Sequence, residues 1–336
     1  MKKHNNNNNN NTKKTALPKN NRRKTEKQER NNHKNMTMAE KRKIVHILNP
    51  VTVDMALKEF MKLQTIMTCS QAKKTSSRTT LGNNVVDAFT LIERLHTKGH
   101  QGISFYDFWK NRKEYSIKPY IKNMLKFYES RQIDEIRKYK YIYNLYFSSI
   151  SIFRPIVAIE LYCKVKSKRV LDFTMGWGGR LVGACALSLD AYYGIDLNKH
   201  LETPYREMVN MLQSVPGHRT DIHLFFKDAL TIDYSKMDYD TVLTSPPYYD
   251  LEVYRRNNEY GSHEEWNEQF YKPLIRKTYQ HLKIGGHYCL NVPHTIYEDG
   301  CVPVLGKCSA KIMLKKGERN IGGDYKEYIY IWKKEN

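Results

Sequence analysis

The sequence lacks several features that would define other classes of protein. No apolar run approaches the roughly 20 residues of a membrane-spanning helix, so we expect no integral membrane protein. The N-terminus is polar and has no apolar core of a secretory signal, so we expect no secretion. The six cysteines form no C-x-x-C pair, which argues against a zinc ribbon or a disulfide scaffold and predicts a reducing intracellular compartment, cytoplasmic or nuclear. They are Cys69, Cys163, Cys185, Cys289, Cys301 and Cys308.

Acidic residues are also scarce. The 336 residues contain 35 Asp and Glu against 56 Lys and Arg, a net charge of +21. Residues 1–45 hold 14 basic and 3 acidic residues, a net +11, which leaves +10 for the rest of the chain. A basic surplus in both parts favours a polyanionic partner, nucleic acid before a membrane surface. A merely solvated basic surface is the alternative.

The chain divides into three regions by composition. Residues 1–40 contain an unbroken asparagine run and almost nothing apolar, which predicts a disordered basic tail. Residues 41–150 have apolar residues at helical spacing and predict a helical accessory region with a possible role in substrate recognition. Aromatic and basic residues alternate over 103–147, which suits nucleic acid, although buried aromatics beneath lysine-covered helix faces explain the same pattern. We expect residues 151–336 to form the catalytic domain.

Short apolar runs alternate with helical patterns from residue 151 onward. This alternation predicts a doubly wound α/β sheet, in which ligands bind beyond the carboxyl ends of the strands. A helix capped by Ser262 and Glu265 is predicted over 262–282, and Pro273 should kink or split it. The predicted strands are 168–172, 191–197, 222–228, 240–244, 287–292, 312–315 and 328–332.

A glycine-rich turn follows the first predicted strand, at Asp172-Phe173-Thr174-Met175-Gly176-Trp177-Gly178-Gly179. Glycine allows a tight turn and lets backbone approach a ligand, but the pattern matches neither a P-loop nor a clean G-x-G-x-x-G. Asp172 at the strand end is suited to bind a cationic amino group. Asp196 ends the second strand, where an acidic residue holds ribose hydroxyls, and Asp228 ends the third, where it can accept from an adenine amino group. Each aspartate alone could equally be a cap or turn residue.

The most specific motif is Thr244-Ser245-Pro246-Pro247-Tyr248-Tyr249, directly after the fourth strand. Two prolines lock the backbone and donate no N–H, so a carbonyl is presented rigidly as an acceptor. Ser245 and the Pro246 carbonyl could accept the two hydrogens of a planar amino group, and Tyr248 could stack on its ring. A proline-rich loop that only ends a strand is the structural alternative.

Taken together, these motifs resemble the AdoMet-dependent amino-methyltransferases of DNA, which modify adenine N6 or cytosine N4. The likeness covers about residues 145–336 and is greatest to methylases of phages and large DNA viruses. Phe153-Arg154-Pro155 looks like the additional cofactor motif that precedes the first strand. The resemblance implies a Rossmann-like class I methyltransferase sheet, AdoMet as cofactor and DNA as partner. Its site residues would be Phe153, Arg154, Asp172, Thr174, Gly176, Gly178, Asp196 and Asp228 for the cofactor, and Ser245, Pro246, Pro247 and Tyr248 for catalysis.

This resemblance implies base flipping, followed by in-line displacement of the methyl group by the amino nitrogen. The Pro-Cys pair of the 5-cytosine methylases is absent, and we find no metal-ligand cluster. No sizeable target-recognition domain follows the motif. Recognition is therefore expected from residues 41–150, the loop 250–261 or the segment 293–311.

Three alternatives remain open. An RNA amino-methyltransferase shares the fold and the Pro-Pro-aromatic motif, and basic charge does not separate RNA from DNA. A protein-glutamine methylase has an Asn-Pro-Pro-Tyr form, which the serine and the basic surplus disfavour. A non-catalytic subunit that binds nucleic acid would have lost motifs that are intact here.

Overall fold

The computed structural model describes residues 36–66, 69, 79–99, 101–147, 150–249, 261–314 and 327–335. The predicted tail and the loop 250–260 lie outside these residues, apart from the last residues of the tail. Residues Ala39–Asn336 form one compact unit, and of the other unit, Met1–Met38, the structure describes residues 36–38.

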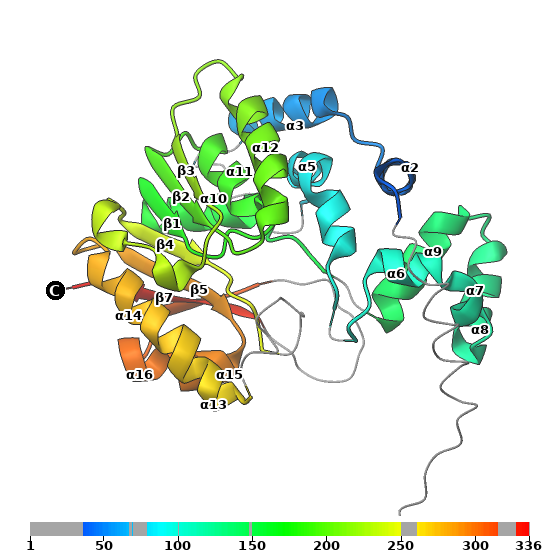
Figure 1. The fold of residues 1–336 in the computed structure, drawn as a ribbon. Coiled ribbons are helices and arrows are strands. Elements are labelled where there is room, and N and C mark those ends of the chain that lie inside the picture. The colour runs from blue at the N-terminus through cyan, green and yellow to red at the C-terminus, as the bar shows by residue number, and fades with distance from the viewer. Residues whose placement is uncertain are drawn as a thin grey trace, which may run out of the picture. The chain divides into compact units, whose positions relative to one another are not determined.

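A seven-stranded sheet organises the larger unit, with strand order β3-β2-β1-β4-β5-β7-β6 (Figure 1). Strands β1 to β5 are parallel, and β7 runs antiparallel to both of its neighbours. This arrangement confirms the predicted Rossmann-like α/β sheet. The strands are β1 (Arg169–Asp172), β2 (Ala191–Ile195), β3 (Asp221–Phe225), β4 (Thr241–Thr244), β5 (His287–Val292), β6 (Ala310–Met313) and β7 (Tyr328–Lys333).

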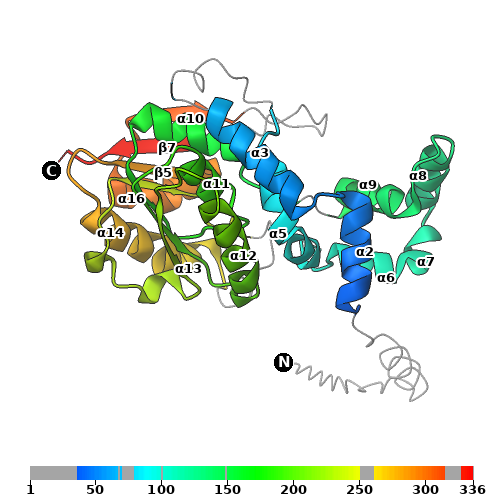
Figure 2. The same ribbon diagram turned by 90° about the horizontal axis from the view of Figure 1, so that it is seen from above.

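Helices cover both faces of the sheet, because successive strand residues point to opposite sides and both sides are apolar. Val170 belongs to the core cluster on one face and Leu171 to the cluster on the other. The first face is covered by α10 (Pro155–Val165), α11 (Gly179–Ala186) and α12 (Glu202–Gln213). Helices α3 (Val53–Ile66) and α5 (Asn83–His96) pack in turn on α11 and α12 (Figures 1 and 2).

The opposite face packs against a chain of helices that begins after the undescribed loop. The Ser262 hydroxyl accepts from the Glu265 amide and caps α13 (His263–Trp266), as predicted. A π-helical turn, η4 (Asn267–Tyr271), then separates it from α14 (Lys272–His281), whose second residue is Pro273. The predicted helix is therefore interrupted, by a π-helical turn that ends two residues before Pro273. The remaining elements on this side are α15 (His294–Ile296), η5 (Tyr297–Cys301) and α16 (Val302–Leu305).

The region before the sheet is helical, as predicted. Many of its aromatic residues form a core of their own, including Phe105, Phe108 and Tyr143, which are all buried. Others lie on the surface: Tyr120, Phe127 and Tyr141 are 40–46% exposed. Burial in a core therefore explains the first group, and a role of the exposed rings in binding nucleic acid stays a prediction. The helices here are α2 (Met38–Leu48), α6 (Phe105–Lys110), α7 (Arg112–Ser116), α8 (Pro119–Glu129) and α9 (Glu135–Tyr146), in addition to α3 and α5.

The cysteine prediction is wrong for one pair. Cys69 and Cys163 form a disulfide across 94 residues of sequence, with Cα atoms 5.2 Å apart. The spacing of the cysteines does not indicate this bond, because the pair is brought together by the packing of the helical region on α10. Cys185, Cys289, Cys301 and Cys308 are free thiols. Among the helices that the structure describes, none has the length and apolarity needed to cross a membrane.

Candidate active site

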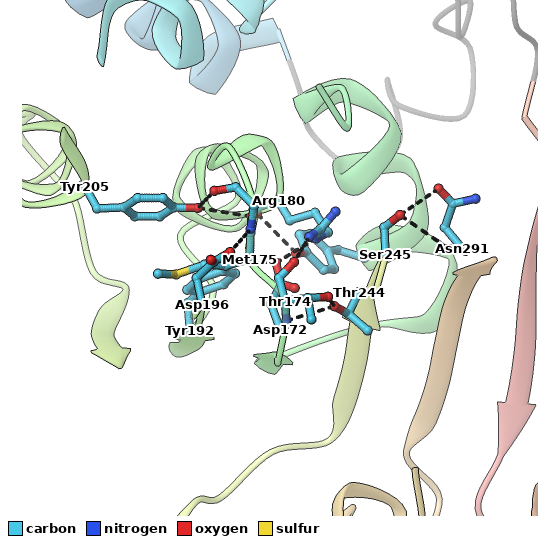
Figure 3. A network of polar contacts seen from close by, with 12 residues as sticks. Asp172, Thr174, Met175, Arg180, Tyr192, Asp196, Tyr205, Thr244, Ser245 and Asn291 are labelled. Atoms are coloured by element: carbon cyan, nitrogen blue, oxygen red, sulfur yellow. Dashed lines mark hydrogen bonds and ion pairs between the residues drawn. The ribbon is translucent and has the colours of Figure 1, made fainter. Parts of the chain in front are cut away.

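The ends of strands β1 and β4 are joined by a pair of threonines. The hydroxyls of Thr174 and Thr244 lie 2.5 Å apart, and the Thr174 amide donates to the Thr244 hydroxyl at 3.2 Å. Thr244 directly precedes Ser245. The glycine turn and the Ser-Pro-Pro-Tyr motif, 70 residues apart in sequence, are thus held side by side at the carboxyl edge of the sheet (Figure 3).

The glycine turn has a conformation that requires glycine. Gly176 and Gly178 have φ values of 57° and 97°, in the region that side chains disfavour. The buried Tyr205 hydroxyl lies 3.1 Å from the carbonyl oxygens of both Met175 and Gly176, and the Met175 amide donates to Ile195 at 2.8 Å (Figure 3). These contacts hold the turn close to the end of β2.

Asp172 is fully buried and engaged by the protein itself. Arg180 Nε lies 2.6 Å from its Oδ2, and the Tyr192 hydroxyl donates to the same oxygen at 2.7 Å. Arg180 also donates to the Thr174 carbonyl at 2.5 Å. Burial lowers the pKa of Arg180, but the Asp172 carboxylate outweighs this and raises it above the ordinary value. The cation beside Asp172 is therefore Arg180, and the pair braces the glycine turn.

Asp196 links the end of β2 to the same turn. Its Oδ2 accepts from the Gly176 amide at 2.9 Å and its Oδ1 from the Asn198 amide at 2.8 Å. Burial raises the pKa of Asp196 to about 6, although these two amide hydrogen bonds act in the opposite direction. A carboxylate poised in this way has a further lone pair on each oxygen for hydroxyl donors of a ligand.

A cavity of about 400 Å³ opens at these strand ends, within the range of small-molecule sites. Its lining combines aromatic residues with several charged ones. Six predicted site residues line it: Thr174, Gly176, Asp196, Asp228, Ser245 and Pro247. The other six, which are Phe153, Arg154, Asp172, Gly178, Pro246 and Tyr248, are not among its lining residues.

Phe153 and Arg154 lie behind the glycine turn. A Cβ atom at Gly179 would come within 1.8 Å of the Phe153 carbonyl oxygen, so the Phe-Arg-Pro segment packs directly on the start of α11. Arg180 lies over the Phe153 ring, 5.0 Å from its centroid, and Arg154 is 3.5 Å from the Thr79 carbonyl. In this structure the segment supports the turn rather than the cavity wall.

The Ser-Pro-Pro-Tyr loop is fixed to strand β5. The Ser245 hydroxyl lies 3.3 Å from both the carbonyl and side-chain oxygens of Asn291, and the Tyr248 hydroxyl donates to the same carbonyl at 3.0 Å (Figure 3 shows the Ser245 contacts). The Tyr248 hydroxyl is also 3.2 Å from the buried carboxylate of Glu327. The Tyr271 hydroxyl donates to the Pro247 carbonyl.

Several residues at the site were not predicted from the sequence. Asn291 had a usable signal, since it is a polar residue at the carboxyl end of an apolar strand. Trp266 and Phe270 line the cavity from α13 and η4, and their helical spacing indicates only a buried face. The last turn of α5 and the residues after it contribute Glu93, His96, Thr97 and Lys98, with no local signal.

No protein-family model matches the chain, and no curated protein matches its sequence. Solved structures of methylases do match. TrmN from Thermus thermophilus is 18% identical over 54% of this chain, with a TM-score of 0.37, and the match spans 48% of that protein's length. An rRNA methylase from Streptococcus thermophilus is 15% identical over 56% of this chain and all of its own, with a TM-score of 0.34. The ribosomal protein L11 methylase from Lactobacillus delbrueckii subsp. bulgaricus is 17% identical over 54% of this chain and 76% of its own, with a TM-score of 0.36. At these identities and TM-scores, the comparisons support no statement about this chain beyond the strand order and the cavity described above.

Proposed function

We propose that this protein transfers a methyl group from AdoMet to the exocyclic amino group of a base in DNA, cytosine N4 or adenine N6. The observation that carries the proposal is the cavity at the carboxyl edge of the sheet. Asp196 and Asp228 line it together with Ser245 of the Ser-Pro-Pro-Tyr motif. The residues that we propose to bind the nucleoside and the amino group therefore line one cavity.

The lining residues fit the proposed cofactor. Asp196 would accept from the ribose hydroxyls, and Asp228, which also caps the Leu230 amide at 3.0 Å, would accept from the adenine amino group. The positive φ of Gly176 lets the backbone approach the ligand. AdoMet, when bound, supplies a methyl group on a positively charged sulfur.

The Ser-Pro-Pro-Tyr loop would orient the target base. As the sequence motif suggests, we assign the amino hydrogens to the Ser245 hydroxyl, which lines the cavity, and to the Pro246 carbonyl next to it. These two acceptors would draw the amino nitrogen toward a tetrahedral geometry and expose its lone pair. The transfer would exchange the sulfur–methyl bond of the donor for a nitrogen–methyl bond, leave a neutral thioether, and release one amino proton to solvent. Correct orientation of the reacting groups can account for a large part of the lowering of the activation free energy in a group transfer.

Aromatic surfaces are available for the ring of an extruded base. Phe173, Trp266 and Phe270 line the cavity, and the sequence motif adds Tyr248 beside it. A stack between a base and an aromatic side chain is worth about 1–3 kcal/mol, which offsets part of the cost of flipping. The surplus of basic residues supports a nucleic acid as the substrate.

Nucleoside mass spectrometry tests this function directly. The protein and its Ser245→Ala variant are incubated with AdoMet and unmethylated DNA, with RNA in parallel, and both nucleic acids are digested to nucleosides. We expect N4-methylcytosine or N6-methyladenine in the DNA treated with the unaltered protein alone. Methylated nucleosides only in the RNA would replace the DNA proposal with the RNA one. No methylation of either would refute the function.

A further inference from the structure

We infer that helix α5, which is outside the sheet, forms part of the cofactor site, and that its Glu93 carboxylate binds the α-ammonium group of AdoMet. This inference rests on the proposed function, because it assigns a further residue to the same cofactor site. AdoMet carries an ammonium and a carboxylate at the end opposite its adenine. The site therefore needs an anionic group for that end, in addition to the residues that face the nucleoside.

The C-terminal end of α5 lines the cavity. Glu93 and His96 lie in its last turn, and Lys98 follows it. The helix is joined to the glycine turn, since the Thr90 hydroxyl lies 3.2 Å from the Trp177 carbonyl. Trp177 follows Gly176, and both residues line the same cavity. The position of this end of α5 is therefore fixed relative to the turn that we assign to the cofactor.

Asp172, the carboxylate that the glycine motif suggests for the ammonium group, does not serve this purpose here. It is fully buried and outside the cavity lining, and its Oδ2 is paired with Arg180 at 2.6 Å; its Oδ1 has no hydrogen-bond partner among the described residues but is closed off from the cavity by burial. The ammonium group of the ligand therefore requires a different carboxylate. Among the residues that the structure describes, three carboxylates line the cavity, those of Glu93, Asp196 and Asp228.

Of these three, Glu93 is the one whose carboxylate accepts no hydrogen bond within the described residues. Asp196 accepts two amide hydrogen bonds, and Asp228 caps a short helix. The Glu93 side chain is 19% exposed, and its ion-pair partner within the described residues is His96, 4.0 Å away. Burial, with help from nearby cations, lowers the pKa of His96, so this ring is largely neutral at pH 7. A partly desolvated carboxylate in this position favours a cationic ligand.

The position of Glu93 along the helix supports the same conclusion. A helix C-terminus carries a partial negative charge, so a carboxylate in the last turn is unfavourable by itself. Here the helix end and Glu93 present negative charge to one cavity. A cation bound between them would relieve both, whereas a neutral ligand would relieve neither.

The test compares AdoMet with 5′-methylthioadenosine, which has the same nucleoside but a neutral sulfur and no amino-acid end. Calorimetric titration of the full chain gives both dissociation constants. For Glu93→Gln we expect AdoMet to bind about tenfold more weakly, the scale of a charge-assisted hydrogen bond, and 5′-methylthioadenosine to bind within about twofold of the unaltered protein. Glu93→Asp, which keeps the charge, should retain part of the AdoMet affinity.

Two further variants complete the comparison. Asp196→Asn should weaken both ligands, because both carry the ribose. Glu114→Gln, an exposed site on α7, should change neither. Equal losses of both ligands in Glu93→Gln, or no loss of AdoMet, would overturn the role of Glu93 while leaving the proposed function standing. An unaltered protein that binds neither ligand would instead overturn the proposed function, and this inference with it.

Discussion

The hydroxyl groups of Tyr248 and Ser245 lie 3.0 Å apart, so the first and last residues of the Ser-Pro-Pro-Tyr motif are in direct contact. Both hydroxyls also reach the main chain of Asn291 in β5. The two prolines between them restrict the backbone further. The orientation of the Ser245 hydroxyl is therefore set jointly by Tyr248 and by strand β5.

Substitutions in this motif should separate catalysis from cofactor binding. Ser245→Ala and Tyr248→Ala remove an acceptor and an aromatic ring, so we expect most turnover to be lost while the Kd for AdoMet is retained. Tyr248→Phe keeps the ring and loses one neutral hydrogen bond, worth about 1 kcal/mol, so turnover should fall about fivefold. Single-turnover methyl transfer measures each rate, and the exposed Tyr141→Phe is the matched control. Full turnover in both alanine variants would refute the assigned roles.

Cofactor affinity should depend on pH through Asp196. Burial raises the pKa of this carboxyl to about 6, and the ionised form is the better acceptor for ribose hydroxyls. Lowering the pH from 7.5 to 5 should therefore weaken AdoMet binding about tenfold. The stability of the free protein depends on pH in the opposite sense. Because folding raises the pKa of Asp196, this group stabilises the folded protein at low pH, and the contribution is lost as the pH rises through about 6.

Calorimetric titration of AdoMet across this pH range provides the measurement. Asp196→Asn should bind more weakly at pH 7.5 and show a much flatter dependence. Asp233→Asn, a change at an exposed 3-10 helix cap, should keep the full dependence. An unchanged slope in Asp196→Asn would show that another group controls binding.

The sheet could be predicted from the sequence because its signals are local. Strand β5 matches the prediction residue for residue, since Gly285-Gly286 and Pro293 bound a short apolar run. Other limits were less accurate: the strands predicted to reach residues 197 and 228 end at Ile195 and Phe225. Propensity does not define where a strand ends, and its pairing with the neighbouring strand does.

Residues of the candidate site could be predicted from the sequence only where they directly follow the end of a strand. Thr174, Asp196 and Ser245 were found in this way. The partner of Asp172 was missed, because nothing in the sequence marks Arg180 as a buried cation. Glu93 was missed for a related reason: it reaches the cavity through the tertiary packing of α5, about 80 residues before the glycine turn.

The buried pair of Asp172 and Arg180 should matter for stability. Removing one partner leaves an uncompensated buried charge, which costs about 3–5 kcal/mol, so Asp172→Asn and Arg180→Met should each lower the free energy of unfolding by this amount. The double variant Asp172→Asn/Arg180→Met should recover part of the loss, because no charge is then left unpaired. Urea denaturation gives these values, and Arg206→Met, from an exposed pair with Glu202, should change the free energy by less than about 1 kcal/mol. Additive losses in the double variant would contradict the coupling.

A buried lysine in the helical region predicts a second dependence on pH. Lys140 donates to the Asn144 side chain at 2.7 Å and lies 5.2 Å from the Phe105 ring centroid, over its face. Burial, with a smaller effect of Arg94, lowers its pKa to about 7. Above pH 7 the unfolded chain therefore holds a proton that the folded chain has released, so this group makes the protein more stable as the pH rises, by up to about 1.4 kcal/mol per pH unit.

Urea denaturation at pH 7 and pH 9 isolates this effect when the protein is compared with Lys140→Met. The unaltered protein should gain about 2 kcal/mol more than the variant over this interval, because methionine fills the same space and does not titrate. Lys122→Met, at an exposed position of α8, should gain as much as the unaltered protein. Parallel gains in the unaltered protein and Lys140→Met would show that Lys140 keeps an ordinary pKa. Its ammonium group would then be charged between the Phe105 and Tyr143 rings, as a cation–π contact rather than a buried neutral amine.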